Sequence, residues 1–333
     1  MVATIKDVSA KTGLGIGTIS KYINGGKVKD QNRIAIERAI QELDFTVNEI
    51  ARGLKTKHTK TVGVVIPEFT SVFSMSIVSV IEDTLRSWGY GVLVCDCRSD
   101  IKREEEAVSF LLNKKVDGII NIPVSNDGAH LKAATVLNLP IVLIDRKIAN
   151  LECNSVLIDN VKAAHEATQL LIENGHRNIA VICGPENVFT SQERLLGYRQ
   201  ALLSGGIMPV ESHIGYGNNT IESGFETMKK LLACNKELTA LFVTNYEMTL
   251  GAIIALNECG LNIPENLSLI GFDNLDLAKV VRPKLTVVAQ PIEEIGKQVS
   301  RLFLEAISSK ESGFSQTVRL QTTIVRGESI KPM

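Results

Sequence analysis

The sequence predicts an all-α head followed by an α/β body that contains two parallel sheets. Apolar residues recur at helical spacing up to about residue 45, whereas after residue 61 short apolar runs of strand length alternate with helical patterns. This alternation runs through the chain twice, which favours two lobes. Charge divides the chain at the same point: residues 1–60 carry eleven Lys or Arg and six Asp or Glu, a net of +5, and the remainder carries −6.

Two short helices joined by a tight turn are predicted at the N-terminus. Thr4 and Asp7 have the spacing of a capping box at the start of the first helix. Gly13 suits the left-handed residue that ends a helix, and Ile19 and Ile23 give the second helix its buried side. This pattern is typical of a helix-turn-helix, whose second helix enters the DNA major groove, although an ordinary helical hairpin shows it too.

A third helix and a linker complete the head. Ile36, Ile40 and Leu43 form an apolar stripe that closes a small core over the first two helices. Residues 47–55 are only weakly helical, because they have few apolar side chains and contain a glycine. We therefore expect three domains. They are a helix-turn-helix DNA-binding head over residues 1–46, a hinge helix and linker over 47–60, and the body over 61–333.

The body shows the alternation of strands and helices that builds parallel sheets. The first strand, 61–67, is a nearly continuous apolar run, as in strands buried on both faces. We expect an N-lobe over about 61–160 and 291–320 and a C-lobe over about 161–290 and 321–330, with a ligand cleft at the carboxyl ends of the strands. Further strands are expected near residues 92–94, 118–120, 141–145, 179–182, 213–216, 240–243, 267–270, 287–288, 318 and 324, with helices between most of them.

Composition argues against several classes of protein. The 44% hydrophobic and 22% charged content is ordinary for a globular chain. No apolar run approaches the length of a membrane span and no signal-peptide pattern occurs, so we expect a cytoplasmic protein. The six cysteines lack metal-ligand spacing, so we expect reduced, mostly buried thiols. No clustered Ser and His, paired acids or metal motif indicates catalysis, and we expect no enzyme activity, cofactor or metal.

A series of short motifs occurs in a fixed order along nearly the whole chain. They include Thr4-Ile5-Lys6-Asp7-Val8, Ala51-Arg52-Gly53-Leu54-Lys55, Ile144-Asp145-Arg146, Gly271-Phe272-Asp273 and Gln290-Pro291. Each motif is weak alone, but their order and spacing are specific. The chain resembles the lactose-repressor/galactose-repressor (LacI/GalR) family of bacterial transcription regulators. That resemblance implies a body like the periplasmic binding proteins, two parallel-sheet lobes with a ligand cleft, which binds an effector and dimerises.

The resemblance also implies a homodimer that places two heads on a pseudo-palindromic operator in double-stranded DNA. It assigns base contacts to Ile16, Gly17 and Lys21, whereas Thr18 and Asn24 are expected to contact phosphates. Gly17 has no side chain with which to read a base, so the direct reading falls mainly on Ile16 and Lys21. The operator is therefore expected to differ from well-known sites, or to be read partly through DNA shape.

The hinge is expected to become helical only on DNA. The resemblance assigns DNA contacts there to Ala51 and Leu54, and Leu54 is expected to wedge into the minor groove and bend the duplex. An ordinary linker leucine is the alternative. Val47 and Gly53 replace a proline and a serine that are common in the family.

The resemblance places an effector, expected to be a sugar or sugar derivative, in the cleft. Carboxylates accept hydrogen bonds from hydroxyls, while arginine and amide groups donate to oxygens and an aromatic ring covers an apolar face. Two departures weaken the match: residues 71–74 lack the usual paired aromatics, and Tyr246 replaces a common aspartate, so a larger, charged or phosphorylated ligand also fits. The implied effector-binding residues are Phe73, Asp145, Arg146, Arg194, Asn245, Asp273 and Gln290.

Three functions are distinguished at this stage. The first is a ligand-controlled transcription regulator, most simply a repressor. The second is a carbon-catabolite-type regulator controlled by a phosphocarrier protein. The third is a sugar-binding protein that does not bind DNA. The sequence does not separate induction from corepression or a dimer from a tetramer, and it leaves the effector and the operator unidentified.

Overall fold

The computed structural model describes residues 3–46, 58–273, 275–308 and 315–333 of the chain. These residues form two compact units, Met1–Thr59 and Lys60–Met333. The predicted hinge helix and its DNA contacts, Ala51 and Leu54, lie outside the described residues. Within those residues, no helix has the length and hydropathy needed to cross a membrane.

The head consists of α1 (Ile5–Thr12), α2 (Ile16–Ile23) and α3 (Asp30–Glu42) around a small core. Val8, Ile19, Ile36 and Ala39, drawn from all three helices, are buried in it. Gly13 ends α1 in the left-handed conformation, with a φ of 68°, as its place before the turn predicts.

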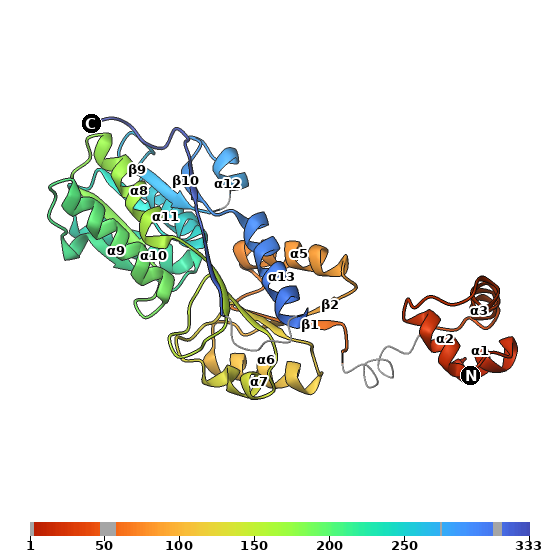
Figure 1. The fold of residues 1–333 in the computed structure, drawn as a ribbon. Helices are drawn as coiled ribbons and strands as arrows, with labels where there is room; N and C mark the ends of the chain where they lie inside the picture. Colours follow the sequence, from red (N-terminus) through yellow and green to blue (C-terminus); the bar gives the residue numbers. More distant parts are fainter. Residues whose placement is uncertain (1–2, 47–57, 274, 309–314) are drawn as a thin grey trace. The chain divides into compact units, whose positions relative to one another are not determined.

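The N-lobe is built on a parallel sheet with the strand order β11-β5-β4-β3-β1-β2. Helices α5 and α13 lie side by side on it (Figure 1). The strands are β1 (Thr61–Ile66), β2 (Gly91–Asp96), β3 (Ile119–Asn121), β4 (Ile141–Ile144), β5 (Asn154–Ile158) and β11 (Thr317–Leu320). The helices are α5 (Val72–Arg86), α6 (Ile101–Asn113), the 3₁₀ turn η1 (Ala129–Leu131), α7 (Lys132–Val136) and α13 (Ile292–Ser308).

The C-lobe repeats this arrangement with the strand order β12-β10-β9-β8-β6-β7, in which only the pairing of β12 with β10 is antiparallel among the described pairs. The strands are β6 (Ile179–Cys183), β7 (Ile214–Tyr216), β8 (Ala240–Val243), β9 (Ser268–Phe272), β10 (Thr286–Ala289) and β12 (Thr323–Val325). The helices are α8 (Asn160–Glu173), α9 (Phe189–Ser204), η2 (Glu211–His213), α10 (Ile221–Cys234), α11 (Tyr246–Glu258) and α12 (Leu275–Val280).

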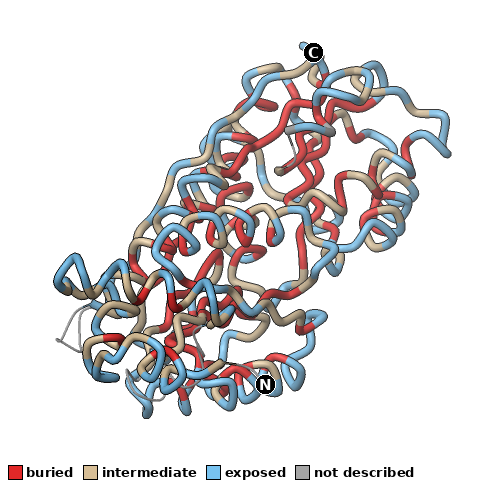
Figure 2. Tube along the Cα trace, turned by 90° about the vertical axis from the view of Figure 1, so that its right-hand side faces the viewer, coloured by how far each residue is buried: buried red, intermediate tan, exposed pale blue. Residues whose placement is uncertain are grey.

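The chain passes between the lobes three times, after β5, after β10 and after β11. The central strands are buried almost throughout, and the buried segments run through the interior of both lobes (Figure 2). The predicted fold class, an all-α head with a two-lobed body of largely parallel sheets, is confirmed.

Three expectations are incomplete or wrong. β5 and the short helix α12 were not predicted, because each follows a strand or loop closely and is too short to show its own periodicity. The cysteines are not mostly buried: Cys97 and Cys183 are buried, whereas Cys234 and Cys259 are exposed. The exposed pair lies at the C-terminal ends of α10 and α11, outside the packed sheet.

Candidate functional site

The outward face of α2 carries the residues predicted to read DNA bases. Ile16 is 44% exposed, and Gly17 and Lys21 are also exposed, whereas Thr18 is half-buried. Ile19 is fully buried in the head core. Gly17 and Lys21, each two residues from it, lie about 160° around the helix, whereas Ile16 is exposed at the first position of α2. An added Cβ at Gly17 would meet nothing within 4 Å, so the helix has room there for a larger side chain.

Polar contacts fix α2 within the head. The Tyr22 hydroxyl lies 2.8 Å from Glu37 Oε1 on α3, and Arg33 Nη1 donates to the same oxygen over 3.0 Å. Asn24, the predicted phosphate contact, is exposed just after α2, and its Nδ2 donates to the backbone oxygen of Ser20 over 2.7 Å. The structure therefore presents α2 as a rigid, outward-facing helix.

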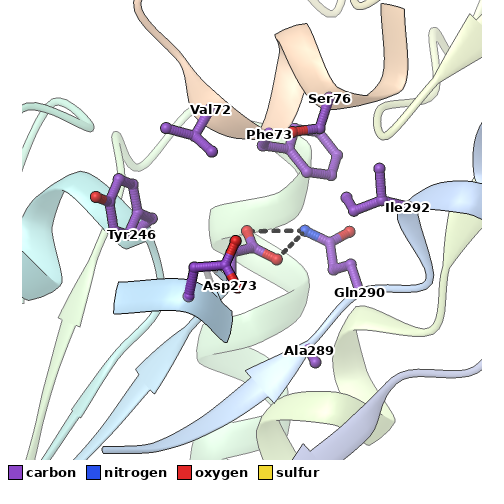
Figure 3. A pocket seen from close by; sticks show the side chains of 9 residues that line it. Val72, Phe73, Ser76, Tyr246, Asp273, Ala289, Gln290 and Ile292 are labelled. Atoms are coloured by element: carbon purple, nitrogen blue, oxygen red, sulfur yellow. Dashed lines mark hydrogen bonds between the residues drawn. The ribbon is translucent and has the colours of Figure 1, made fainter. Parts of the chain in front are cut away.

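A cavity of about 250 Å³ opens between the two lobes of the body. Its walls come from α5 on the N-lobe side, from α11, α12 and the end of β9 on the C-lobe side, and from the crossover after β10 (Figure 3). Phe73 from one lobe and Tyr246 from the other supply two aromatic side chains. The lining residues are Val72, Phe73, Ser76, Tyr246, Asp273, Asp276, Ala289, Gln290 and Ile292.

Asp273 and Gln290 form the polar centre of this cavity. Gln290 Nε2 donates to both carboxylate oxygens of Asp273 over 3.0 Å each, as the dashed lines in Figure 3 show. Burial raises the pKa of Asp273 to about 7, against the opposing effects of Arg194 and the Gln290 hydrogen bond. Gln290 is only 8% exposed, and its Oε1 has no hydrogen-bond partner. An acceptor and a carboxyl group thus lie ready for a ligand that donates hydrogen bonds.

Asp145, Arg146 and Arg194 form a separate ionic cluster between the lobes. Asp145 follows β4 of the N-lobe, and its two carboxylate oxygens lie 3.6 Å from Arg146 Nε and 4.0 Å from Arg194 Nη2. Arg194 comes from α9 of the C-lobe. Because none of the three lines the cavity, this cluster links the lobes beside the ligand space.

Two of the three guanidinium nitrogens of Arg194 donate hydrogen bonds to protein groups. Its Nε donates to Asn160 Oδ1 and its Nη1 to the backbone oxygen of Thr244, both over 2.7 Å. The guanidinium also lies 3.9 Å from the centre of the Phe272 ring, a cation–π contact. Burial lowers the pKa of Arg194, while Asp145 and Asp273 favour its charged form.

Asn245 caps a helix in this structure. Its Oδ1 accepts from the backbone N–H of Met248 over 2.9 Å at the start of α11, and its Nδ2 donates to Glu247 Oε2 over 2.8 Å. Burial raises the pKa of Glu247, and the charge of Glu247 in turn favours the protonated form of Asp273. Sequence reasoning did not single out Glu247, which accepts a hydrogen bond from the Asn245 side chain.

Of the seven predicted effector residues, Phe73, Asp273 and Gln290 line the cavity. Asp145, Arg146 and Arg194 lie together in the ionic cluster and Asn245 caps α11. Of the lining residues that were not predicted, Tyr246 had a sequence signal, because it directly follows Asn245 at the end of a strand. Its ring supplies an aromatic side chain where the segment 71–74 contributes only Phe73. Val72, Ser76 and Ile292 carry no polar signal that a strand-end rule would detect.

The side chains that line the cavity suit the binding of a small molecule. In the described part of the chain, no group of three or more His, Cys, Asp or Glu has an arrangement that could hold a metal ion. The cavity offers hydrogen-bond acceptors, an amide and two aromatic rings, which suit recognition of a polar ligand with an apolar face.

Known proteins resemble this chain over its full length. The model of a family described as periplasmic binding proteins and sugar binding domain of LacI family matches residues 59–325. Catabolite control protein A of Priestia megaterium is 35% identical, over 99% of this chain and 100% of that protein. The structure titled transcriptional regulator CelR-cellobiose complex has a TM-score of 0.76 and 32% identity, covering 98% and 99% of the two chains. The Lac repressor dimer bound to operator and the anti-inducer ONPF has a TM-score of 0.88 and 25% identity, covering 99% and 100%.

Proposed function

The chain belongs to the LacI family of transcriptional regulators, and from this membership we propose a repressor that binds operator DNA as a homodimer under the control of a small ligand. One observation carries the proposal: the cavity takes its walls from both lobes of the body. A ligand there contacts both lobes and stabilises one arrangement of them. It controls DNA binding through the difference between its affinities for the two arrangements.

The head supplies the DNA-binding part of this function. Ile16, Gly17 and Lys21 face outward on α2 and are the proposed base contacts, with Thr18 and Asn24 as phosphate contacts. Residues 1–46 form the proposed DNA-binding domain, residues 47–60 the hinge and linker, and 61–333 the effector-binding body. Contacts from Ala51 and Leu54 in the hinge belong to the same proposal. A regulator of this kind acts on DNA in the cytoplasm.

We propose a sugar or sugar derivative as the ligand. A relative of known structure is titled as a complex with cellobiose. The cavity here has a carboxyl group and an amide for hydroxyls, and the rings of Phe73 and Tyr246 for the apolar faces of a sugar.

The test separates the two parts of the molecule. The full chain and a chain lacking residues 1–56 are titrated against operator fragments selected from a random DNA pool. They are also heated with a panel of sugars and sugar derivatives. We expect the shorter chain to lose operator binding and keep the ligand-induced rise in melting temperature. We also expect the affinity of the full chain for its operator to fall steeply with salt, because phosphate contacts release counterions. Tight operator binding by the shorter chain would refute the proposal.

A second candidate is control by a phosphocarrier protein. The similarity to a catabolite control protein supports this candidate, and the formed cavity favours the small ligand. Gel shifts with the ligand panel and then with the phosphorylated phosphocarrier distinguish the two. A change in operator affinity caused by the carrier alone, with no response to any small molecule, would favour the second candidate.

A further inference from the structure

Helix α2 ends in a turn of two glycines that bond its last backbone oxygens. Gly25 is left-handed, with a φ of 74°, and its N–H donates to the Tyr22 oxygen over 2.9 Å. The Gly26 N–H donates to the Lys21 oxygen over 2.8 Å. These two bonds define a Schellman motif, in which the residue at the place of Gly26 often packs on the residue at the place of Lys21.

The side chain of Lys21 lies against Gly26. A Cβ added to Gly26 would stand 2.6 Å from Lys21 Cγ, 3.3 Å from Lys21 Cε and 2.9 Å from the Lys21 backbone oxygen. Carbon atoms in favourable contact stand about 3.5–4.0 Å apart. The Lys21 side chain therefore lies in this direction only because residue 26 has no Cβ.

The other direction along the helix is open, and Lys21 does not use it. A long helical side chain commonly covers the turn before its own, which for Lys21 is the turn of Gly17, four residues earlier. A Cβ added to Gly17 would meet nothing within 4 Å, so the Lys21 side chain does not cover that turn. Gly26 thus admits Lys21 toward the end of α2, while the surface at Gly17 stays clear.

The ammonium group of Lys21 is not needed to cap α2. Asn24 Nδ2 donates to the backbone oxygen of Ser20 over 2.7 Å, and the two glycines bond the next two oxygens of the helix. In the described part of the chain, no hydrogen bond or ion pair occupies the Lys21 ammonium group, and the residue is exposed. Its charge is therefore available to DNA.

We infer that Gly26 is a positioning residue for DNA recognition: it fixes the direction of the Lys21 side chain and so decides which base pair the ammonium group meets. The inference rests on the proposed DNA-binding function, in which Lys21 is a base contact. A side chain at residue 26 displaces Lys21 toward the open turn of Gly17. One helical turn is about 5.4 Å, more than the step of about 3.4 Å between base pairs, so the displaced ammonium group leaves its base.

Single base-pair variants of the selected operator test the inference on the full chain. Lys21→Ala first identifies the base pair that Lys21 reads, as the position where this variant loses its preference among the four base pairs. We expect Gly26→Ala to lower the preference at the same position at least fivefold, with less than a twofold change in affinity for non-specific DNA. Fluorescence anisotropy titrations at constant salt measure these affinities. A retained preference in Gly26→Ala, or an equal loss for every operator variant, would overturn the inference.

The double variant separates a change in Lys21 from damage to the head. In Lys21→Ala the side chain ends at Cβ, so an alanine at residue 26 meets only the backbone oxygen at 2.9 Å, which it also meets beside the native lysine. We expect Gly26→Ala to have no further effect on base preference in this background. A loss of affinity as large as that in the native background would show that residue 26 acts on the fold and not through Lys21.

Gly25→Ala is the matched control in the same turn. Its left-handed φ strains an alanine, but an added Cβ there meets nothing within 4 Å, so this variant destabilises the end of α2 without displacing Lys21. We expect a lower melting temperature and an unchanged preference at the base pair that Lys21 reads. An equal loss of preference in Gly25→Ala and Gly26→Ala would overturn the inference.

The wild-type chain and Lys21→Ala distinguish failure of the inference from failure of the proposed function. A Lys21→Ala chain that binds the operator and keeps every base preference would refute the inference alone. A wild-type chain that selects no operator would refute the proposed function and the inference with it.

Discussion

The two lobes of the body repeat one arrangement of strands, and each places an aspartate after the equivalent strand. Asp145 follows β4 and Asp273 follows β9. Both residues are left-handed, with φ of 65° and 63°. Each donates its backbone N–H to the next strand, over 3.0 Å to Val156 and over 2.8 Å to Val288. Left-handed non-glycine residues cost about 1–3 kcal/mol, so the sheet pairing that surrounds them must hold both in place.

The surroundings of these two aspartates differ. Asp145 lies between Arg146 and Arg194 and belongs to the cluster that joins the lobes. Asp273 accepts from a neutral amide, Gln290, and lines the cavity. The repeated topology therefore sets where each carboxyl group lies, and side chains from other elements decide whether it pairs with arginines or lines the cavity.

Arg194→Met tests the N-lobe half of this comparison and should have the largest effect. It removes one of the two arginine partners of Asp145 and leaves Asn160 Oδ1 and the Thr244 carbonyl oxygen without their donor, so we expect a loss of about 3–5 kcal/mol in the free energy of unfolding of the body. Denaturant titration measures this loss. The control is Arg301→Met, which breaks an exposed pair with Glu305 and should cost less than about 1 kcal/mol. Similar losses in both variants would show that the cluster does not join the lobes.

Asp145→Asn removes the carboxylate and keeps its shape. Two positive groups then lose their shared partner, so we expect a loss of about 1–3 kcal/mol at pH 7. A double-mutant cycle with Arg194→Met, followed by chemical denaturation, should be non-additive because the two side chains share one cluster. Additive losses would mean that the 4.0 Å separation of Asp145 Oδ1 and Arg194 Nη2 carries no coupling.

Asp273→Asn should increase the free energy of unfolding relative to the wild type as the pH rises, whereas the two preceding variants decrease it. Burial raises the pKa of Asp273 to about 7 in the folded protein, well above its ordinary value. Its contribution to stability is therefore complete below about pH 4 and is lost as the pH rises through about 7. We expect the variant to gain about 2–3 kcal/mol relative to the wild type between pH 5 and pH 8. Denaturation at several pH values checks this, and an unchanged difference would make Asp273 an ordinary exposed acid.

The sequence could predict the site residues that directly follow a strand, but not the side chains that surround them. Short apolar runs predicted strands that end close to Asp145 and Asp273. In the structure these residues directly follow β4 and β9, at the carboxyl edges of the two sheets. The sequence could not tell their environments apart, because Arg194, Asn160 and Gln290 approach from helices and crossovers distant in the chain. Asn245 differs, because its contacts with Glu247 and Met248 are local. An asparagine directly before a helix is an N-cap signal, which the sequence interpretation as a ligand residue passed over.

Helices and strands with a long, strong apolar pattern were predicted, and short ones were missed. β1 and α13 are long and strongly patterned, and both were predicted. β5 was missed although Val156, Leu157 and Ile158 are buried, because a short apolar run directly before a helix has no period of its own. The exposure of Lys21 on α2 followed from spacing, since its position two residues after the buried Ile19 places it on the other side of the helix; the assignment of base contacts came from the family resemblance and stays a prediction.

Glu104→Gln probes a buried group that has no counterpart in the other lobe and should have the smallest effect. Glu104 is the fourth residue of α6, where α10 of the C-lobe has Gly224. Glu104 Oε1 accepts from Asn121 Nδ2 over 3.0 Å and from the Val124 backbone N–H over 3.1 Å, and His130 Nε2 lies 3.5 Å away.

Burial raises the pKa of Glu104, which favours its neutral form, and a glutamine carbonyl oxygen accepts from the same two donors. We therefore expect Glu104→Gln to unfold within about 1 kcal/mol of the wild type at pH 7. Glu104→Ala leaves both donors unpaired and should cost about 2–4 kcal/mol. If Gln cost as much as Ala in denaturant titrations, the charge on Glu104 and its pairing with His130 would matter more than the hydrogen bonds. The N-lobe would then depend on a second buried ion pair in addition to the Asp145 cluster.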